Sequence, residues 1–149
     1  MSLLSRRGAL ALSAGAALAL VSADDGLATP AEADAEITKF TGGKGAAKGK
    51  IAIDLPEIAE NGNTVPLSIA VDSPMLPDDY VSEILVVADD NPNPRVVRFH
   101  LTPMGGRAEV ATRIRLNTTE NVIVVATTST GKVYADRKMV KVTVGGCGG

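Results

Sequence analysis

The stretch Arg107-Ala108-Glu109-Val110-Ala111-Thr112-Arg113-Ile114-Arg115-Leu116-Asn117 alternates between two kinds of side chain. Every second residue from Ala108 to Leu116 is apolar or threonine, and most of the residues between them are charged. Successive side chains of a β-strand point to opposite faces of its sheet, so this period of two predicts a strand with one buried face. After residue 50 no long run has the 3.6-residue period of a helix. These residues therefore indicate an all-β fold.

Six more strands are predicted from runs rich in Val, Ile and Thr that end at Pro, Asn, Asp or Gly. Seven short strands in about 95 residues are typical of an immunoglobulin-like antiparallel β-sandwich. The Cys and Trp core of antibody domains is absent, because the chain has one Cys and no Trp. The six strands cover residues 50–55, 64–72, 80–88, 95–101, 121–128 and 133–144.

Two of these strands have features that predict their place in a sheet. Pro66 lacks the N–H that a sheet ladder needs, so the strand at 64–72 should lie at an edge or carry a bulge. The run at 80–88 is almost continuously apolar, as expected of a central strand.

The beginning of the chain has the form of an export signal. Arg6 and Arg7 precede an apolar run from Ala9 to Val21, which is shorter than the roughly 20 residues that span a bilayer. The paired arginines resemble a bacterial twin-arginine signal, although Ala9 and Ala11 depart from that motif. The sequence therefore predicts a periplasmic protein that is exported by the twin-arginine route.

Three small-residue motifs, which end at Ala23, Ala33 and Ala35, are candidate cleavage sites, and we expect cleavage near Ala35. The expected organisation is an export signal at 1–35, a mobile lead-in with at most a helical turn at 36–49, a sandwich at 50–144 and an arm at 145–149. No cysteine for lipid attachment lies near the signal, so no membrane anchor is expected.

The charge balance argues against a nucleic-acid or acidic-membrane partner. The chain has 15 basic and 17 acidic residues, of which two and four lie in residues 1–35, leaving 13 of each in the mature part. A surface that binds phosphate groups needs a basic excess.

The chain closes with Gly145-Gly146-Cys147-Gly148-Gly149, and Cys147 is its only cysteine. Glycines on both sides predict a flexible arm that presents the thiol to other molecules. The alternative uses of a lone cysteine are a buried small hydrophobe and a disulfide between subunits.

The residues offer no catalytic apparatus of their own. His100, the only histidine, falls within a predicted strand, and no other His or Cys has the spacing of a metal site. We therefore expect no enzyme, metal or cofactor, but a carrier whose thiol is modified by other proteins.

Several motifs in order resemble those of the SoxY family of sulfur carriers: the segments at 55–62, 72–75, 91–94 and 113–116, then Gly145 to Gly149. The resemblance implies that sulfur intermediates attach covalently to Cys147. It also implies a heterodimer with SoxZ. A haem c-type cytochrome would load thiosulfate, a hydrolase would release sulfate, and in many organisms a sulfur dehydrogenase would oxidise the remaining sulfur.

Two alternatives remain open at the level of sequence. An exported structural module could use Cys147 only to link subunits through a disulfide. A ubiquitin-like carrier, which also ends in Gly-Gly, would hold sulfur as a C-terminal thiocarboxylate. That carrier needs nucleoside triphosphate for its activation.

Overall fold

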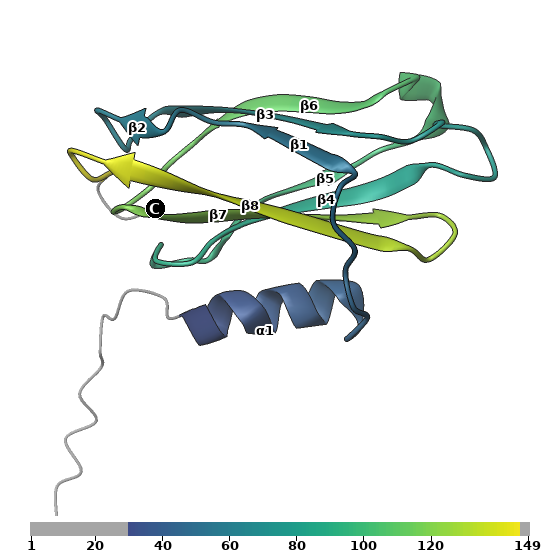
Figure 1. Cartoon of the computed structure of the whole chain (residues 1–149), viewed down its shortest axis with the longest axis horizontal. Helices are drawn as coiled ribbons and strands as arrows, with labels where there is room; N and C mark the ends of the chain where they lie inside the picture. Colours follow the sequence, from purple (N-terminus) through teal and green to yellow (C-terminus); the bar gives the residue numbers. More distant parts are fainter. Residues whose placement is uncertain (1–29, 147–149) are drawn as a thin grey trace, which may run out of the picture.

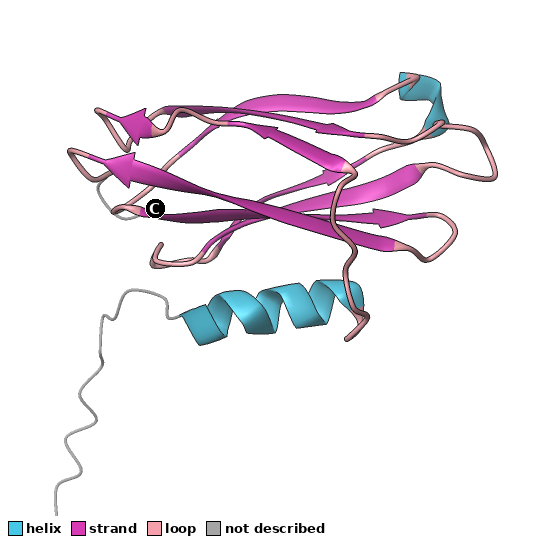
Figure 2. Cartoon of the chain, in the orientation of Figure 1, coloured by secondary structure: helices cyan, strands magenta, loops and turns pink. Residues whose placement is uncertain are grey.

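The computed structural model describes residues 30–146. These residues form two facing β-sheets with one α-helix, α1 (Pro30–Thr41), packed outside them (Figure 1, Figure 2). The strands are β1 (Ile51–Asp54), β2 (Ile58–Ala59), β3 (Val65–Val71), β4 (Val81–Ala88), β5 (Arg95–His100), β6 (Ala108–Ile114), β7 (Glu120–Thr128) and β8 (Val133–Val142). A short 3-10 helix, η1 (Pro103–Gly105), follows β5.

One sheet has the strand order β1-β3-β6 and the other the order β2-β8-β7-β4-β5. All pairs of strands are antiparallel except β2 and β8, which run parallel. The predicted sandwich and its seven strands are confirmed, with boundaries that differ by three residues at most. Strand β2 was not predicted, because two residues after Pro56 are too few to show a period.

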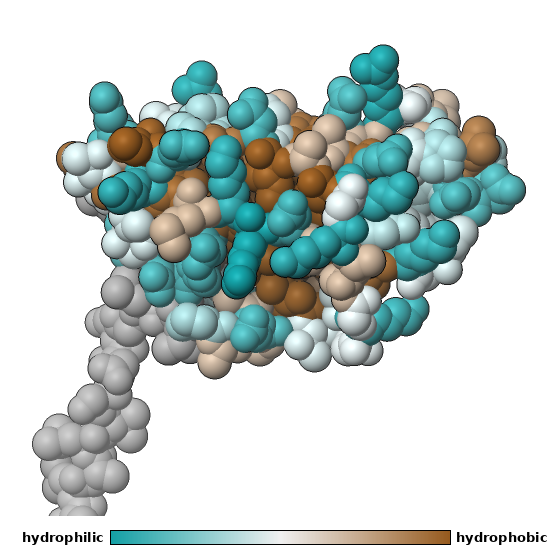
Figure 3. Space-filling view, viewed as in Figure 1, coloured by the Kyte–Doolittle hydropathy of each residue, from teal (hydrophilic) through white to brown (hydrophobic). Residues whose placement is uncertain are grey.

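The core lies between the sheets and is almost entirely aliphatic. On β3 the side chains of Val65, Leu67, Ile69 and Val71 alternate into the core, as the period of two requires. Figure 3 shows one side of the sandwich, on which hydrophilic side chains project outward and hydrophobic atoms show between them.

The expectation for Pro66 was wrong, since β3 is the central strand of its sheet. Pro66 lies opposite Arg113 of β6, but β1 ends at Asp54, which pairs with Ser68. No β1 residue therefore faces Pro66, and its missing N–H removes no hydrogen bond to β1. Strand β4 is central, as its continuous apolar run predicted.

The helix α1 is longer than the single turn expected within residues 36–49. Ala33, Ile37 and Phe40 recur at the spacing of one helix face, and they pack on Leu85 and Val87 of β4. This apolar face of α1 begins at Ala33, within the predicted export signal at 1–35, and continues into the predicted lead-in at 36–49. The domain boundary expected from the sequence therefore falls inside the helix.

The remainder of the lead-in is hydrogen-bonded to β8. The Ala47 N–H donates to the Val133 carbonyl at 2.9 Å, and the Ala47 carbonyl accepts from the Ala135 N–H at 3.0 Å. A cut near Ala35 would divide α1 and remove its buried Ala33, whereas a cut after Ala23 would leave the helix whole.

Candidate functional site

The last described residues are fastened to one end of the sandwich by backbone hydrogen bonds. The Gly62 N–H donates to the Val144 carbonyl at 2.8 Å, and the Leu116 N–H donates to the Gly62 carbonyl at 2.8 Å. The Leu116 carbonyl in turn accepts from the Gly146 N–H at 2.9 Å. We call Gly62, Leu116, Val144 and Gly146 the backbone clasp. Because of it, the chain is held to the sandwich as far as Gly146, the last residue that the structure describes.

Two glycines allow the three segments to come this close. A Cβ on Gly62 would overlap the Leu116 carbonyl oxygen and lie 2.8 Å from the Gly146 nitrogen. A Cβ on Gly145 would overlap the carbonyl oxygen of Asn117. Glycine is required here because the backbones approach closely, a use that is distinct from flexibility.

The prediction of a flexible arm needs correction for its first two residues. Gly146 is buried and hydrogen-bonded, and Gly145 lies against Asn117. The sequence could not show this, since a glycine pair looks the same in a hinge and in a close backbone contact. The chain is therefore held to the sandwich as far as Gly146, two residues beyond Val144, where the arm was expected to begin.

A buried carboxylate supports the loop that holds Gly146. Glu120 is only 2% exposed, and its Oε2 accepts from the Asp90 N–H at 2.9 Å. Its Oε1 accepts from the Asn117 N–H at 3.1 Å. Burial raises the pKa of Glu120, and the backbone donors at Asp90, Thr118 and Asn117 offset part of this rise. Glu120 thus ties the loop after β4 to the loop before β7.

Side-chain amides complete this support. The Asn91 Oδ1 accepts from the Asn117 N–H at 2.8 Å, and the Asn91 Nδ2 donates to the Arg115 carbonyl at 2.8 Å. Both carboxylate oxygens of Asp89 accept from Asn121, also at 2.8 Å. The turn at 89–91 therefore fixes both neighbours of Leu116, whose carbonyl binds Gly146.

Replacing Glu120 with Gln should change how stability depends on pH. Between the ordinary carboxyl pKa and the raised pKa of Glu120, the folded chain binds more protons than the unfolded chain, so the free energy of unfolding falls as pH rises. The variant lacks this contribution. We therefore expect the stability of the wild type relative to the variant to fall as pH rises through this window.

Urea unfolding between pH 4 and pH 7 measures this difference. Glu109→Gln, which alters an exposed carboxylate on β6, is the matched control. Curves of wild type and Glu120→Gln that stay parallel over the whole range would contradict the assignment.

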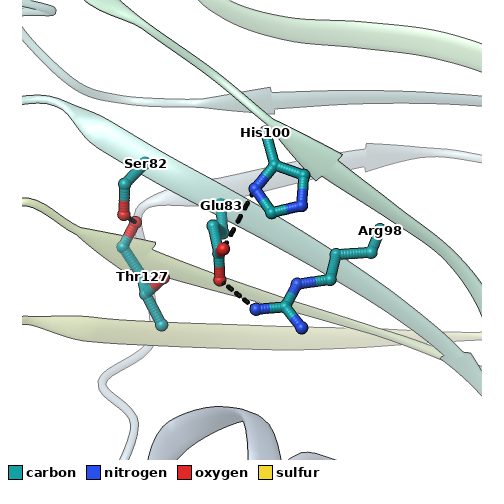
Figure 4. A network of polar contacts seen from close by, with 5 residues as sticks. All are labelled: Ser82, Glu83, Arg98, His100 and Thr127. Atoms are coloured by element: carbon teal, nitrogen blue, oxygen red, sulfur yellow. Dashed lines mark hydrogen bonds and ion pairs between the residues drawn. The ribbon is translucent and has the colours of Figure 1, made fainter.

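His100 does not lie near the backbone clasp. It ends β5, whereas the loop that contacts Asn117 precedes Arg95 at the other end of that strand. Its Nδ1 lies 3.0 Å from Glu83 Oε1, and Arg98 donates to Glu83 Oε2 at 2.6 Å (Figure 4). The neighbouring Ser82 hydroxyl donates to the Thr127 carbonyl at 3.1 Å (Figure 4). The arrangement is an exposed polar network across β4 and β5.

Several residues singled out in the sequence lie outside the described part of the chain: Arg6, Arg7, Cys147, Gly148 and Gly149. Within residues 30–146, no group of three or more His, Cys, Asp or Glu is placed to hold a metal ion. Within the same residues, no helix has the length and apolar character needed to cross a membrane.

Comparison with known families identifies the chain. The family model of the sulfur oxidation protein SoxY matches residues 37–147. The chain belongs to the SoxY family. The solved structure of the sulfur carrier protein SoxY from Chlorobium limicola f thiosulfatophilum is 32% identical and has a TM-score of 0.64. It matches over 78% of this chain and 100% of its own length.

More distant solved structures share the fold alone. Superoxide reductase (neelaredoxin) from Ignicoccus hospitalis is 17% identical with a TM-score of 0.56, over 78% of this chain and 94% of its own. A putative superoxide reductase from Thermotoga maritima is 15% identical with a TM-score of 0.56, over 65% and 93% of the two chains. No curated protein sequence matches this chain.

Membership of the SoxY family supports a sulfur-carrier role in sulfur oxidation for this chain. The resemblance expected from the sequence motifs is thereby confirmed, and the matched segment begins within α1, at residue 37.

Proposed function

We propose that Cys147 covalently binds sulfur intermediates derived from thiosulfate and presents them to partner enzymes in the periplasm. The segment that matches the SoxY family runs through Cys147, which directly follows the buried Gly146. The hydrogen bond between Gly146 and Leu116 holds the residue that precedes Cys147 on the sandwich. This match, which includes the lone cysteine, is the observation that carries the proposal.

The loading step couples a thiol to thiosulfate by oxidation. The Cys147 sulfur forms a bond to the terminal sulfur of thiosulfate, the thiol gives up its proton, and two electrons pass one at a time to a haem c-type cytochrome, which hands each on before it accepts the next. A hydrolase then adds water across the bond to the sulfonate group. Sulfate and two protons leave, and a persulfide anion stays on Cys147. Sulfur suits this cycle because its bonds to sulfur form and break reversibly.

The proposed partners follow from family membership. A SoxZ subunit forms a heterodimer with this chain, and a sulfur dehydrogenase, where a cell makes one, oxidises the persulfide. The twin-arginine signal at Arg6 and Arg7 exports folded proteins, so a folded heterodimer can leave the cytoplasm on one signal. The carrier needs no cofactor of its own.

Intact-mass analysis of the protein from thiosulfate-grown cells tests the proposal. We expect added sulfur or sulfonate groups on the peptide that contains Cys147, and their absence from cells grown without reduced sulfur. The same measurement gives the mature N-terminus and so chooses between cleavage near Ala35 and after Ala23. Finding only disulfide-linked dimers would instead favour a structural cysteine.

A further inference from the structure

A cavity of about 300 Å³ lies at the side of the sandwich, where the turn at 91–94 meets the end of β6. Strand β6 is an edge of the three-stranded sheet, and β5 is an edge of the five-stranded sheet. Three arginines line the cavity: Arg95 at the start of β5, Arg113 near the end of β6, and Arg115 just after it. We call this cavity the arginine pocket. Two segments that resemble the SoxY family, 91–94 and 113–116, supply six of its eight lining residues.

The chain itself does not neutralise the positive charge of the arginine pocket. All three arginines are exposed, and none of them forms an ion pair with a carboxylate among residues 30–146. Arg98, further along β5, is by contrast paired with Glu83. In the neighbouring loops, the carboxylates of Asp89 and Glu120 accept hydrogen bonds from Asn121 and from backbone N–H groups instead. Three unpaired guanidinium groups around one cavity favour an anionic ligand.

The fold directs two of the arginines away from the core. Ile114 and Leu116 are buried in the core and alternate with Arg113 and Arg115, so the arginines point outward. The Arg113 Nη1 donates to the Thr64 Oγ1 at 3.4 Å. This contact places the Arg113 guanidinium beside the turn that carries Gly62 of the backbone clasp.

The turn at 91–94 fixes the backbone of the other two arginines. The Asn91 Nδ2 donates to the Arg115 carbonyl at 2.8 Å, and the Asn93 Oδ1 accepts from the Arg95 N–H at 3.2 Å. The backbone positions from which the side chains project are therefore set before a ligand arrives. Such preorganisation lowers the entropy that binding would otherwise cost.

Guanidinium groups suit an oxyanion of tetrahedral sulfur. An arginine presents its N–H donors in a planar fork that can bond two oxygens of one anion. Sulfate, thiosulfate and the sulfonate end of a thiosulfonate all carry such oxygens on a tetrahedral sulfur. Ligand sites typically have volumes of about 300–1,000 Å³, and the arginine pocket is at the lower end of this range, as expected for a small anion.

The arginine pocket is also within reach of a sulfur adduct on Cys147. Figure 1 shows the end of β8 and the segment between β6 and β7 at the same end of the sandwich. The bond from the Gly146 N–H to the Leu116 carbonyl is 2.9 Å long, which puts the Gly146 and Arg115 Cα atoms at most about 11 Å apart. The Cys147 Cα, one residue further, is at most about 15 Å from that of Arg115. An extended arginine, an extended thiosulfonate and the hydrogen bond between them span roughly 16 Å.

We propose that the arginine pocket binds an oxyanion of tetrahedral sulfur. The inference rests on the proposed function for its two sources, which are the sulfonate end of the adduct on Cys147 and free thiosulfate or sulfate. The three guanidinium groups balance the negative charge of the anion and hold its oxygens against the sandwich.

The first arm of the test measures free anions. Mature Cys147→Ser protein, as purified, is titrated with sodium sulfate or sodium thiosulfate at constant ionic strength, which sodium chloride maintains. We expect saturable shifts of the arginine Nε–H signals and of the amides at 91–95 and 113–117 in NMR spectra, with a Kd in the millimolar range. Arg113→Gln and Arg115→Gln should each raise this Kd about tenfold, because each removes a charge-assisted hydrogen bond.

The second arm attaches the anion to the wild-type thiol without any enzyme. The Cys147 thiolate attacks an inner sulfur of tetrathionate, a sulfur–sulfur bond of tetrathionate breaks, and thiosulfate leaves. The cysteine then carries a thiosulfonate, and gel filtration removes the free anions. We expect the signals that sulfate shifts in the first arm to be shifted in this adduct, and the shifts to be lost when Arg115→Gln is loaded in the same way.

Two further variants separate a built site from a general effect of charge. Arg107→Gln makes the same change at the other end of β6, where Arg107 lies 3.6 Å from Glu109, and it should bind sulfate with the Kd of the parent. Arg115→Lys keeps the charge but not the planar fork, so its Kd should lie between those of the parent and Arg115→Gln. An equal loss in Arg107→Gln would overturn the proposal.

The two arms also distinguish the sources of the anion. Arginine-dependent shifts in the first arm alone support a site for free anions, and shifts in the second arm alone support a site for the adduct. Shifts in neither arm, or shifts that no arginine variant alters, would overturn the pocket and leave the proposed function standing. Absence of sulfur on Cys147 from thiosulfate-grown cells would contradict the proposed function alone, since the first arm needs no thiol.

Discussion

Replacing Cys147 with Ser should abolish thiosulfate-dependent turnover by the partner enzymes and leave the sandwich intact. Cys147 is the only cysteine of the chain, so no second thiol can accept sulfur. A serine hydroxyl has the size of a thiol but forms no reversible bond to sulfur under these conditions. The measurement is the rate at which the reconstituted enzymes oxidise thiosulfate, with the wild-type carrier as reference.

The same variant separates the thiol carrier from a thiocarboxylate carrier. A carrier that holds sulfur on its C-terminal carboxyl group would still be loaded as Cys147→Ser, whereas a thiol carrier would not. Circular dichroism and thermal unfolding of the variant should match the wild type, because residue 147 lies beyond the core strands. Turnover above background in a correctly folded variant would contradict a carrier role for Cys147.

The sandwich was predictable because its strands follow the simplest pattern that a chain can show. Along β3 and β6 every second side chain enters the core, and this period can be read without knowing which strands are neighbours. The order of the strands within each sheet could not be predicted in this way. Pro66 indicated an edge strand, whereas β3 is the central strand of its sheet. The error arose because β1 is short, and the length of a neighbouring strand cannot be read from the proline.

The site was predictable only in part. The glycines around Cys147 indicated that the end of the chain has a functional role. They also predicted flexibility at Gly145 and Gly146, where the backbone is in fact in close contact with the sandwich. Gly62 and Leu116 are 54 residues apart in sequence, and neither segment has a sequence motif from which a contact with residue 146 could be predicted. Glu120 resembles any exposed acid in a turn, because its burial results from the loops that close over it.

Adding one methyl group to Gly62 should destabilise the whole domain. The Cβ of Gly62→Ala would overlap the Leu116 carbonyl oxygen, which is backbone and cannot rotate away. Overpacking of this kind costs about 1–3 kcal/mol, and each hydrogen bond lost from the clasp adds about 0.5–1.5 kcal/mol. We expect a loss of roughly 2–4 kcal/mol in the free energy of unfolding, measured by urea denaturation. Gly105→Ala is the matched control, because a Cβ there meets no atom within 4 Å.

Gly145→Ala should have a different effect, because the clash with the Asn117 carbonyl can be relieved if the chain after Val144 detaches. The free energy of unfolding should then fall by less than in Gly62→Ala, while the Gly146 amide loses its protection from hydrogen exchange. An opening that costs about 1.4 kcal/mol less speeds this exchange roughly tenfold. Hydrogen exchange followed by mass spectrometry of the C-terminal peptide measures it. Unchanged protection at Gly146 in Gly145→Ala would mean that the clasp does not hold the end of the chain. The thiol would then project from Val144 on a flexible arm, as the glycines alone suggest.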